Sequence, residues 1–286
     1  MNTDIEDYII SKNNTGKDNY NIIDYKLYDY QKCKILFQNL FKWIYINVFQ
    51  NIDTSIINMQ HILAKNILKN FQIELNKQIR LTKIPNLRKS VLISLLSNIY
   101  KLHDFDFNFD NKCIDNLKEC EKYFNILKLL LRKKPTRALS GITSVTVLTA
   151  PFPDGQTFSC KHNCYYCPNE PAHEGNNFQA QPRSYLYDEP AVRRANQHGF
   201  DAYGQMKNRM DTLFMNGHKV DKIDIVVEGG TFTEYPIDYL EEYHRDLFYA
   251  ANTYFEENKR EKLSIEEEVK INETAKAHII GISIET

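Results

Sequence analysis

The second half of the chain alternates between short β-branched runs and segments with helical periodicity, and this alternation constrains the fold more than any other feature. The expected strands are rich in Ile, Val and Thr and cover residues 142–148, 223–227 and 279–284. The expected helices cover residues 201–216, 239–259 and 264–277. Strands that alternate with helices form a parallel sheet or barrel. The sequence therefore predicts an α/β fold over residues 138–286, with a long polar loop after the first strand.

The first half has a different pattern, which is typical of packed helices. Residues 31–137 repeat apolar side chains at helical spacing, and the last of these helices is expected to end before Pro135. Three cysteines of this region are expected to be small buried hydrophobic residues: Cys33, Cys113 and Cys120. Residues 1–30 are polar and are expected to form a tail. The predicted organisation is a tail, a helical region and an α/β domain.

The formal net charge is −1, but basic residues are concentrated in residues 61–137. This segment holds 16 Lys and Arg against 7 Asp and Glu, a net charge of +9, so the rest of the chain carries −10. Such a segment indicates a polyanionic partner, although a solvated helical surface has the same composition. No run approaches the roughly 20 apolar residues of a membrane span, and the acidic first residues lack a signal-peptide pattern. We therefore expect a cytoplasmic protein.

Three further cysteines lie on the polar loop after the first strand, with the spacing C-x3-C-x2-C: Cys160, Cys164 and Cys167. Structural zinc usually takes four ligands, so His162 or His173 would have to complete such a site. A disulfide framework needs an even number of cysteines and an oxidising compartment. Thiolates also hold iron–sulfur clusters. Three of them on one loop can hold three irons of a [4Fe–4S] cluster and leave the fourth iron open, which is the interpretation we favour.

An open iron is what radical S-adenosylmethionine enzymes require, because it binds the S-adenosylmethionine whose cleavage releases a 5′-deoxyadenosyl radical. Barrels built from βα units place their active sites at the carboxyl ends of the strands, which is where this loop begins. Tyr166 precedes the last cysteine, at a position that is usually aromatic in this superfamily. Gly229, Gly230 and Thr231 end the second strand, and glycine there lets a ligand approach the backbone closely. These four residues are the predicted cofactor contacts, together with Lys222, introduced below.

Several segments resemble one family within this superfamily, the catalytic subunit of Elongator. They are KPTRALSGI at 134–142, CYYCP at 164–168, GHKVDKI at 217–223, EGGTF at 228–232, NETAK at 272–276 and IGISIET at 280–286. The resemblance covers about residues 132–286. It departs from the eukaryotic members at the first gap of the cysteine motif, which is longer there, and at Asn169-Glu170, where they have a Gly-Gly pair.

The resemblance implies a tRNA-modifying enzyme that uses a [4Fe–4S] cluster, S-adenosylmethionine and acetyl-CoA to form 5-carboxymethyluridine at the wobble position. It assigns the three loop cysteines to the cluster and Lys222 to acetyl-CoA. The basic helical region occupies the place where members of the family contact tRNA. Phosphate contacts from Lys and Arg supply affinity rather than sequence reading. The predicted tRNA contacts are Lys133, Lys134 and Arg137.

The chain ends after the third expected strand, whereas members of the family continue through further strands and an acetyltransferase-like domain. Three parallel strands do not close a barrel, and the last one presents an unpaired edge. We therefore expect an incomplete barrel, with a second chain or other Elongator-like subunits as candidate partners. Two alternatives remain at this point. One is a different radical enzyme such as a methylthiotransferase, and the other is a truncated, inactive remnant that only binds tRNA.

Overall fold

The computed structural model describes residues 29–50, 66–84, 89–101, 107–109, 112–114, 117–256 and 258–285. The chain divides into two compact units, Met1–Leu131 and Arg132–Thr286, which are described here as unit 1 and unit 2. The division falls a few residues before the boundary predicted between residues 137 and 138. All but the last two residues of the predicted tail lie outside the described residues.

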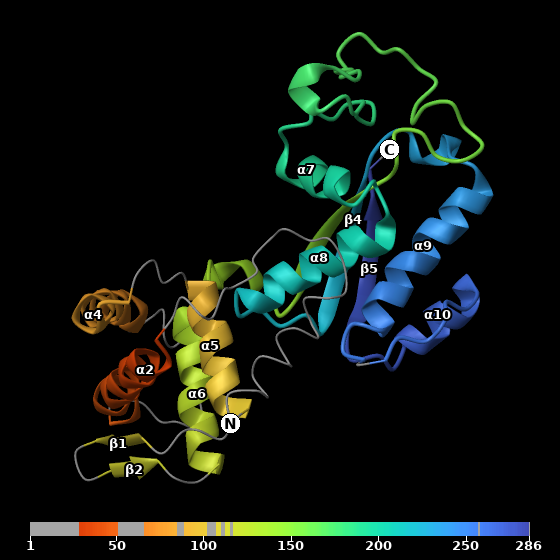
Figure 1. The fold of residues 1–286 in the computed structure, drawn as a ribbon. Helices are drawn as coiled ribbons and strands as arrows, with labels where there is room; N and C mark the ends of the chain where they lie inside the picture. The colour runs from red at the N-terminus through yellow and green to blue at the C-terminus, as the bar shows by residue number, and fades with distance from the viewer. Residues whose placement is uncertain are drawn as a thin grey trace. The chain divides into compact units, whose positions relative to one another are not determined.

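Unit 1 contains amphipathic helices (Figure 1). They surround a core of aromatic and aliphatic side chains. Its helices are α2 (Tyr30–Ile44), continued by the π-helical turn η2 (Tyr45–Phe49), then α4 (Ile67–Thr82), α5 (Lys89–Lys101) and α6 (Leu117–Leu131). The Asp29 side chain caps α2 by accepting a hydrogen bond from the Lys32 amide at 3.2 Å. The ring of Phe41 lies 5.3 Å from that of Phe124, which ties α2 to α6.

One part of unit 1 differs from the all-helical prediction. Strands β1 (Phe107–Phe109) and β2 (Lys112–Ile114) form a short antiparallel hairpin. Residues 104–110 alternate Asp or Asn with Phe, which is a two-residue period and favours a strand over a helix. The predicted burial of Cys33 and Cys120 is confirmed, and burial raises the pKa of their thiols to about 11 and about 12. Cys113 lies on β2, and its side chain is outside the described part of the chain.

Unit 2 is built on a parallel sheet with the strand order β3-β4-β5, which confirms the predicted α/β class. The strands are β3 (Thr143–Leu148), β4 (Lys222–Glu228) and β5 (His278–Ile284). Its helices are α7 (Pro190–Gln197), α8 (Ala202–Met215), α9 (Ile237–Asn252) and α10 (Ile265–Asn272), with short 3-10 turns η3 (Pro135–Ala138), η4 (Glu174–Asn176) and η5 (Phe232–Glu234). Open segments of βα barrels have this architecture.

Helices α8 and α9 pack on the sheet (Figure 1). Alternate side chains of the strands enter the core that they form with these helices. Val145, Ile225 and Val227 are buried there with Met206 and Met210. These methionines therefore belong to the core of unit 2. The β4 side chains that point to the opposite face are only partly buried.

The predicted helix boundaries need three corrections. Helix α7 lies in the segment predicted as loop, and it begins with Pro190 at its first position, where a missing N–H costs nothing. Helix α9 ends at Asn252 rather than at residue 259, and α10 ends at Asn272 rather than at residue 277. Both asparagines use their side-chain amides for bonds between elements, and Asn272 donates to Asn252 Oδ1 at 2.7 Å. This pairing competes with continued helix.

Candidate functional site

The cysteine loop leaves the carboxyl end of β3, as the sequence predicts. Cys160 and Cys167 are half-buried, Cys164 is exposed, and all three carry free thiols. The Cys167 amide donates to the Cys164 carbonyl at 3.2 Å, which folds the second half of the motif into a turn. Two of the three sulfur positions are therefore held by a tight local turn on an otherwise polar loop.

Residues that follow β4 hold the first cysteine in place. The Thr231 hydroxyl lies 3.0 Å from Cys160 Sγ, and the Thr231 amide donates to the Ser159 carbonyl at 3.2 Å. The His162 amide also points at Cys160 Sγ, at 3.4 Å. Cys160 is thus fixed by contacts from two different strand ends, although only its own loop is near it in sequence.

Glu234, on η5, binds the two basic residues that follow Cys160. Its Oε1 lies 2.9 Å from Lys161 Nζ and 3.0 Å from His162 Nε2, and its Oε2 accepts from the Lys161 amide at 3.3 Å. The hydrogen bond from Lys161 is the main reason why the pKa of the Glu234 carboxyl is lowered. Glu234 therefore fixes the course of the loop just after the first cysteine.

The glycine pair at the end of β4 is required by packing within the chain. Gly229 has φ +146°, and a Cβ there would collide with Thr149 Oγ1. A Cβ on Gly230 would collide with the carbonyl oxygen of Ser159. The pair lets the β4 end approach both the end of β3 and the start of the cysteine loop. Its role as a ligand contact stays a prediction.

Two tyrosines of the segment after β4 fasten the strand ends together. The Tyr235 hydroxyl lies 2.7 Å from Thr149 Oγ1 and accepts from the Gly230 amide at 3.1 Å. The Tyr239 hydroxyl accepts from the Ala150 amide at 2.8 Å, and its ring stacks on that of Tyr235. Burial raises the pKa of both phenols, so both remain protonated at neutral pH. The backbone at the carboxyl ends of β3 and β4 is therefore rigidly cross-linked.

Arg183 is a site residue that the sequence analysis missed. It is only 8% exposed, and its guanidinium donates to Asn163 Oδ1 and, at 3.3 Å, to the Cys164 carbonyl. Its amide donates to Ser159 Oγ at 2.9 Å. A single arginine on a polar loop gives no sequence signal for this role. Arg183 closes the loop by joining residue 159 to residues 163 and 164.

Carboxylates lie at the adjacent ends of β4 and β5. The Glu285 amide donates to the Val227 carbonyl at 2.9 Å, which places Glu285 beside Glu228. The Tyr185 hydroxyl donates to Glu285 Oε2 at 3.0 Å. Burial, followed by repulsion from Glu285 and Glu189, raises the pKa of Glu228. The strand ends beside the cysteine loop are therefore polar and negatively charged.

The structure does not bring all predicted site residues together. Among the described residues, no three His, Cys, Asp or Glu side chains lie close enough to hold a metal ion, so the three thiols share a loop without converging. Tyr166 is 89% exposed. Within unit 2, the predicted contacts fall at two different ends of the sheet.

Lys222 is the first residue of β4, whereas Gly229 follows its last residue. Six steps along a strand at about 3.3 Å each separate Lys222 from Glu228 by roughly 20 Å. Lys133 lies at the same end as Lys222, because its amide donates to the Asn216 carbonyl at 3.1 Å in the turn before β4. The predicted acetyl-CoA residue and the predicted tRNA residues thus belong to the amino ends of the strands, opposite the cysteine loop.

No helix in the described ranges combines the length and the apolar character that a membrane crossing needs. No family model matches the chain. A curated relative, the tRNA uridine(34) acetyltransferase of Methanocaldococcus infernus, is 37% identical over 167 residues, which are 58% of this chain and 28% of that protein. Elongator complex protein 3 of Dictyostelium discoideum is 33% identical over 166 residues, 58% of this chain and 28% of that protein.

Human Elongator complex protein 3 is 33% identical over 165 residues, again 58% of this chain and 28% of that protein. The solved structure of Methanocaldococcus infernus Elp3 lacking residues 1–46 shares 27% identity, covers 51% of this chain and 23% of that chain, and has a TM-score of 0.33. The chain thus spans little more than a quarter of the length of these curated relatives. The predicted resemblance to the catalytic subunit of Elongator is confirmed over the matched residues.

Proposed function

We propose that this chain carries the radical S-adenosylmethionine part of a tRNA-modifying enzyme that forms 5-carboxymethyluridine at the wobble uridine from acetyl-CoA. The similarity to proteins named tRNA uridine(34) acetyltransferase supports the substrate class. The observation that carries the radical chemistry is the cysteine triplet at the carboxyl end of β3, anchored through Thr231 to the end of β4. Active sites of βα barrels lie at this end of the sheet.

The donor types fit a [4Fe–4S] cluster, which would bring the three thiols together on binding. Cys160, Cys164 and Cys167 are free, they are partly or fully exposed, and they lie on one loop. When bound, the cluster would supply the electron that cleaves S-adenosylmethionine. The chain's own contribution is positional, because Thr231 and Glu234 fix the start of the loop while Arg183 fixes its middle.

A zinc site completed by histidine is the less favoured use of the same cysteines. His173 accepts from the Gly175 amide through Nδ1 at 3.0 Å and pairs with Glu170 through Nε2 at 3.2 Å. His162 pairs with Glu234 through Nε2. A metal would have to displace these contacts, whereas three thiolates and an open iron need no histidine.

The proposal places tRNA and acetyl-CoA at the amino ends of the strands, where Lys133, Lys134, Arg137 and Lys222 lie. Exposed Lys and Arg side chains suit phosphate groups of either ligand. We also propose further Elongator-like subunits or a second chain as partners, because the edge of β5 has no strand partner among the described residues.

The test is anaerobic reconstitution of the full chain with iron and sulfide, followed by iron analysis and an assay for 5′-deoxyadenosine released from S-adenosylmethionine. We expect about four irons per chain, and loss of both iron and cleavage in Cys164→Ala. The control Cys33→Ala removes a buried thiol of unit 1 and should leave both unchanged. Absence of a cluster, or one bound zinc ion, would refute the radical proposal. A cluster without cleavage would locate the defect in the S-adenosylmethionine pocket instead.

A further inference from the structure

Positive side chains gather around the turn between α8 and β4. Arg132 Nε donates to the Gly217 carbonyl at 2.8 Å, and His218 Nε2 donates to the Lys133 carbonyl at the same distance. Arg137 lies on η3, which follows directly, and Arg209 lies on α8. The three guanidiniums are close enough to His218 to add to the effect of burial and lower the pKa of its imidazole. Arg132, Arg137, Arg209 and His218 thus form one basic cluster.

The charge of this cluster is not compensated within the described residues. No carboxylate there forms an ion pair with Arg132, Arg137 or Arg209. The exposed Arg193 on α7, by contrast, pairs with Asp188 at 2.5 Å. Arg209 is half-buried, so its guanidinium is partly withdrawn from water without an anion beside it. Buried charges in proteins are normally paired, and an unpaired one is strongly unfavourable.

His218 supplies a second, independent observation. It is only 5% exposed, and its Nδ1 has no hydrogen-bond partner. Because Nε2 faces a carbonyl oxygen, Nε2 carries the proton, and Nδ1 becomes a second donor only when the ring is protonated. An anion among the arginines would stabilise that protonated form and satisfy the orphan nitrogen.

We propose that Arg132, Arg137, Arg209 and His218 form a binding site for a phosphate group. Guanidinium groups match phosphate oxygens in both charge and geometry, and the exposed Arg137 leaves the cluster open to solvent. Of the residues predicted to contact tRNA, only Arg137 belongs to this site. The phosphate can come from an RNA backbone or from a free phosphate ester. The proposal stands apart from the modification reaction, since phosphate binding needs neither cluster nor catalysis.

The first test is thermal unfolding of the full chain in sodium phosphate and in sodium chloride at equal ionic strength. A ligand that binds only the folded state raises the Tm, so the wild type should be more stable in phosphate. Arg137→Gln changes an exposed residue and should fold normally, yet lose most of this difference. Arg209→Gln should lose it too and gain stability in chloride, because repulsion is relieved. The control Arg193→Gln removes the same charge from a paired surface arginine and should keep the phosphate effect.

The second test identifies the source of the phosphate by fluorescence anisotropy with a 20-nucleotide single-stranded RNA. If the backbone is the ligand, Arg137→Gln weakens binding by about tenfold and lowers the salt slope by about 0.7. If a free ester is the ligand, RNA affinity stays unchanged while the phosphate-dependent Tm shift is lost. Equal Tm values of the wild type in phosphate and chloride, or an undiminished shift in both variants, would overturn the proposal. A working phosphate site without tRNA modification would refute only the proposed function.

Discussion

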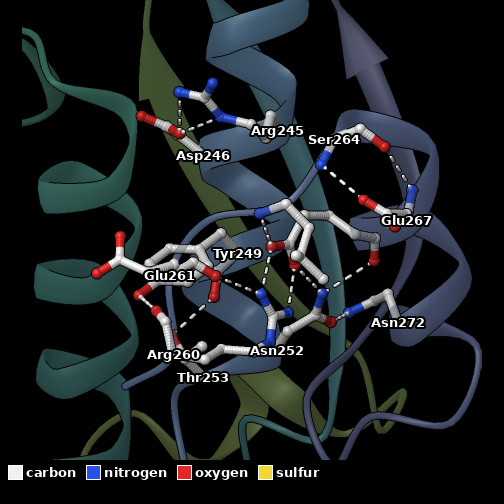
Figure 2. A network of polar contacts seen from close by, with 12 residues as sticks. Arg245, Asp246, Tyr249, Asn252, Thr253, Arg260, Glu261, Ser264, Glu267 and Asn272 are labelled. Carbon is white, nitrogen blue, oxygen red and sulfur yellow. Dashed lines mark hydrogen bonds and ion pairs between the residues drawn. The ribbon is translucent and has the colours of Figure 1, made fainter.

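The connection of α10 to α9 depends on a buried ion pair whose removal has a calculable effect. Glu268 is fully buried, and Arg260 binds it through two parallel contacts of 2.6 Å. Figure 2 shows Arg260, Asn252 and Asn272 within the surrounding network of polar contacts. Asn252 Nδ2 and the Leu263 amide donate to the same carboxylate at 2.8 and 3.1 Å. Burial acts to raise the pKa of Glu268. The hydrogen bonds and the charge of Arg260 outweigh this effect, so the pKa is lowered.

Arg260→Met would leave the buried carboxylate with only its two neutral donors. Breaking one side of a buried pair lowers the free energy of unfolding by about 3–5 kcal/mol. Glu268→Met should have a smaller effect, because the Arg260 side chain is already 29% exposed and can turn into water. The double variant Arg260→Met/Glu268→Met leaves no charge buried and should recover most of the loss.

The pH dependence gives a further check on the same variant. In the wild type the pKa of Glu268 is lowered by folding, so its stabilising effect is present above the ordinary glutamate pKa and is lost as pH falls through the folded value. Without Arg260, burial should raise the pKa of Glu268 instead. Protonation of Glu268 would then remove the unpaired buried charge. The difference in stability between Arg260→Met and the wild type should therefore shrink from pH 7 to pH 5.

Amide hydrogen exchange of peptides from α9, α10 and β5 is the suitable assay, because it reports unit 2 directly. Trp43, the only tryptophan, lies in unit 1, and its fluorescence serves as an internal reference. An effect of Arg260→Met below about 1 kcal/mol would show that the pair behaves like an exposed one. A double variant as unstable as the sum of the two single variants would also refute the reasoning.

Three other substitutions test the contacts around the cysteine loop. Gly230→Ala should destabilise unit 2 by at least about 1–3 kcal/mol, measured by hydrogen exchange, because the new methyl group collides with the Ser159 carbonyl. Arg183→Met should speed tryptic cleavage after Lys161, since the two guanidinium contacts to Asn163 and Cys164 are lost; an unchanged cleavage rate would assign the loop's order to other residues. In the reconstituted chain, Thr231→Val should lower the cluster's reduction potential in an EPR-monitored titration, whereas Thr231→Ser should retain it, because hydrogen bonds to the sulfur atoms raise the potential.

The parts of the fold that depend on local patterns were predictable from the sequence. The strands of unit 2 were found within one or two residues, because each is a compact β-branched run. The ends of α9 and α10 were not found, since Asn252 and Asn272 at these ends pair with each other and Asn252 also donates to Glu268. A local sequence pattern does not indicate a hydrogen-bond partner that lies 16 or 20 residues away in the chain. The β1–β2 hairpin had a local signal, the alternation of Phe with Asp and Asn, which the surrounding helical pattern obscured.

The residues of the candidate site also fall into two groups, those that a sequence motif predicts and those that only the structure identifies. The cysteine triplet and the glycine pair are visible as motifs, because their residue types are rare and their spacing is fixed. The loop is held by Thr231, Glu234 and Arg183 through contacts that span 20 residues or more. Polar residues of these common types give no sequence signal for such contacts. Sequence motifs therefore identified the groups that a cluster would need. Only the structure identified the groups that position them.

The glycine pair shows why one motif can meet two requirements at once. Gly229 and Gly230 lack the Cβ atoms that would strike Thr149 and Ser159, so the end of β4 lies against the loop that carries Cys160. The same close approach lets Thr231 reach the Cys160 sulfur. A bare backbone at a strand end is also what a ligand's polar groups need for access to N–H and C=O. Packing between two strand ends and access for a ligand thus require the same residues.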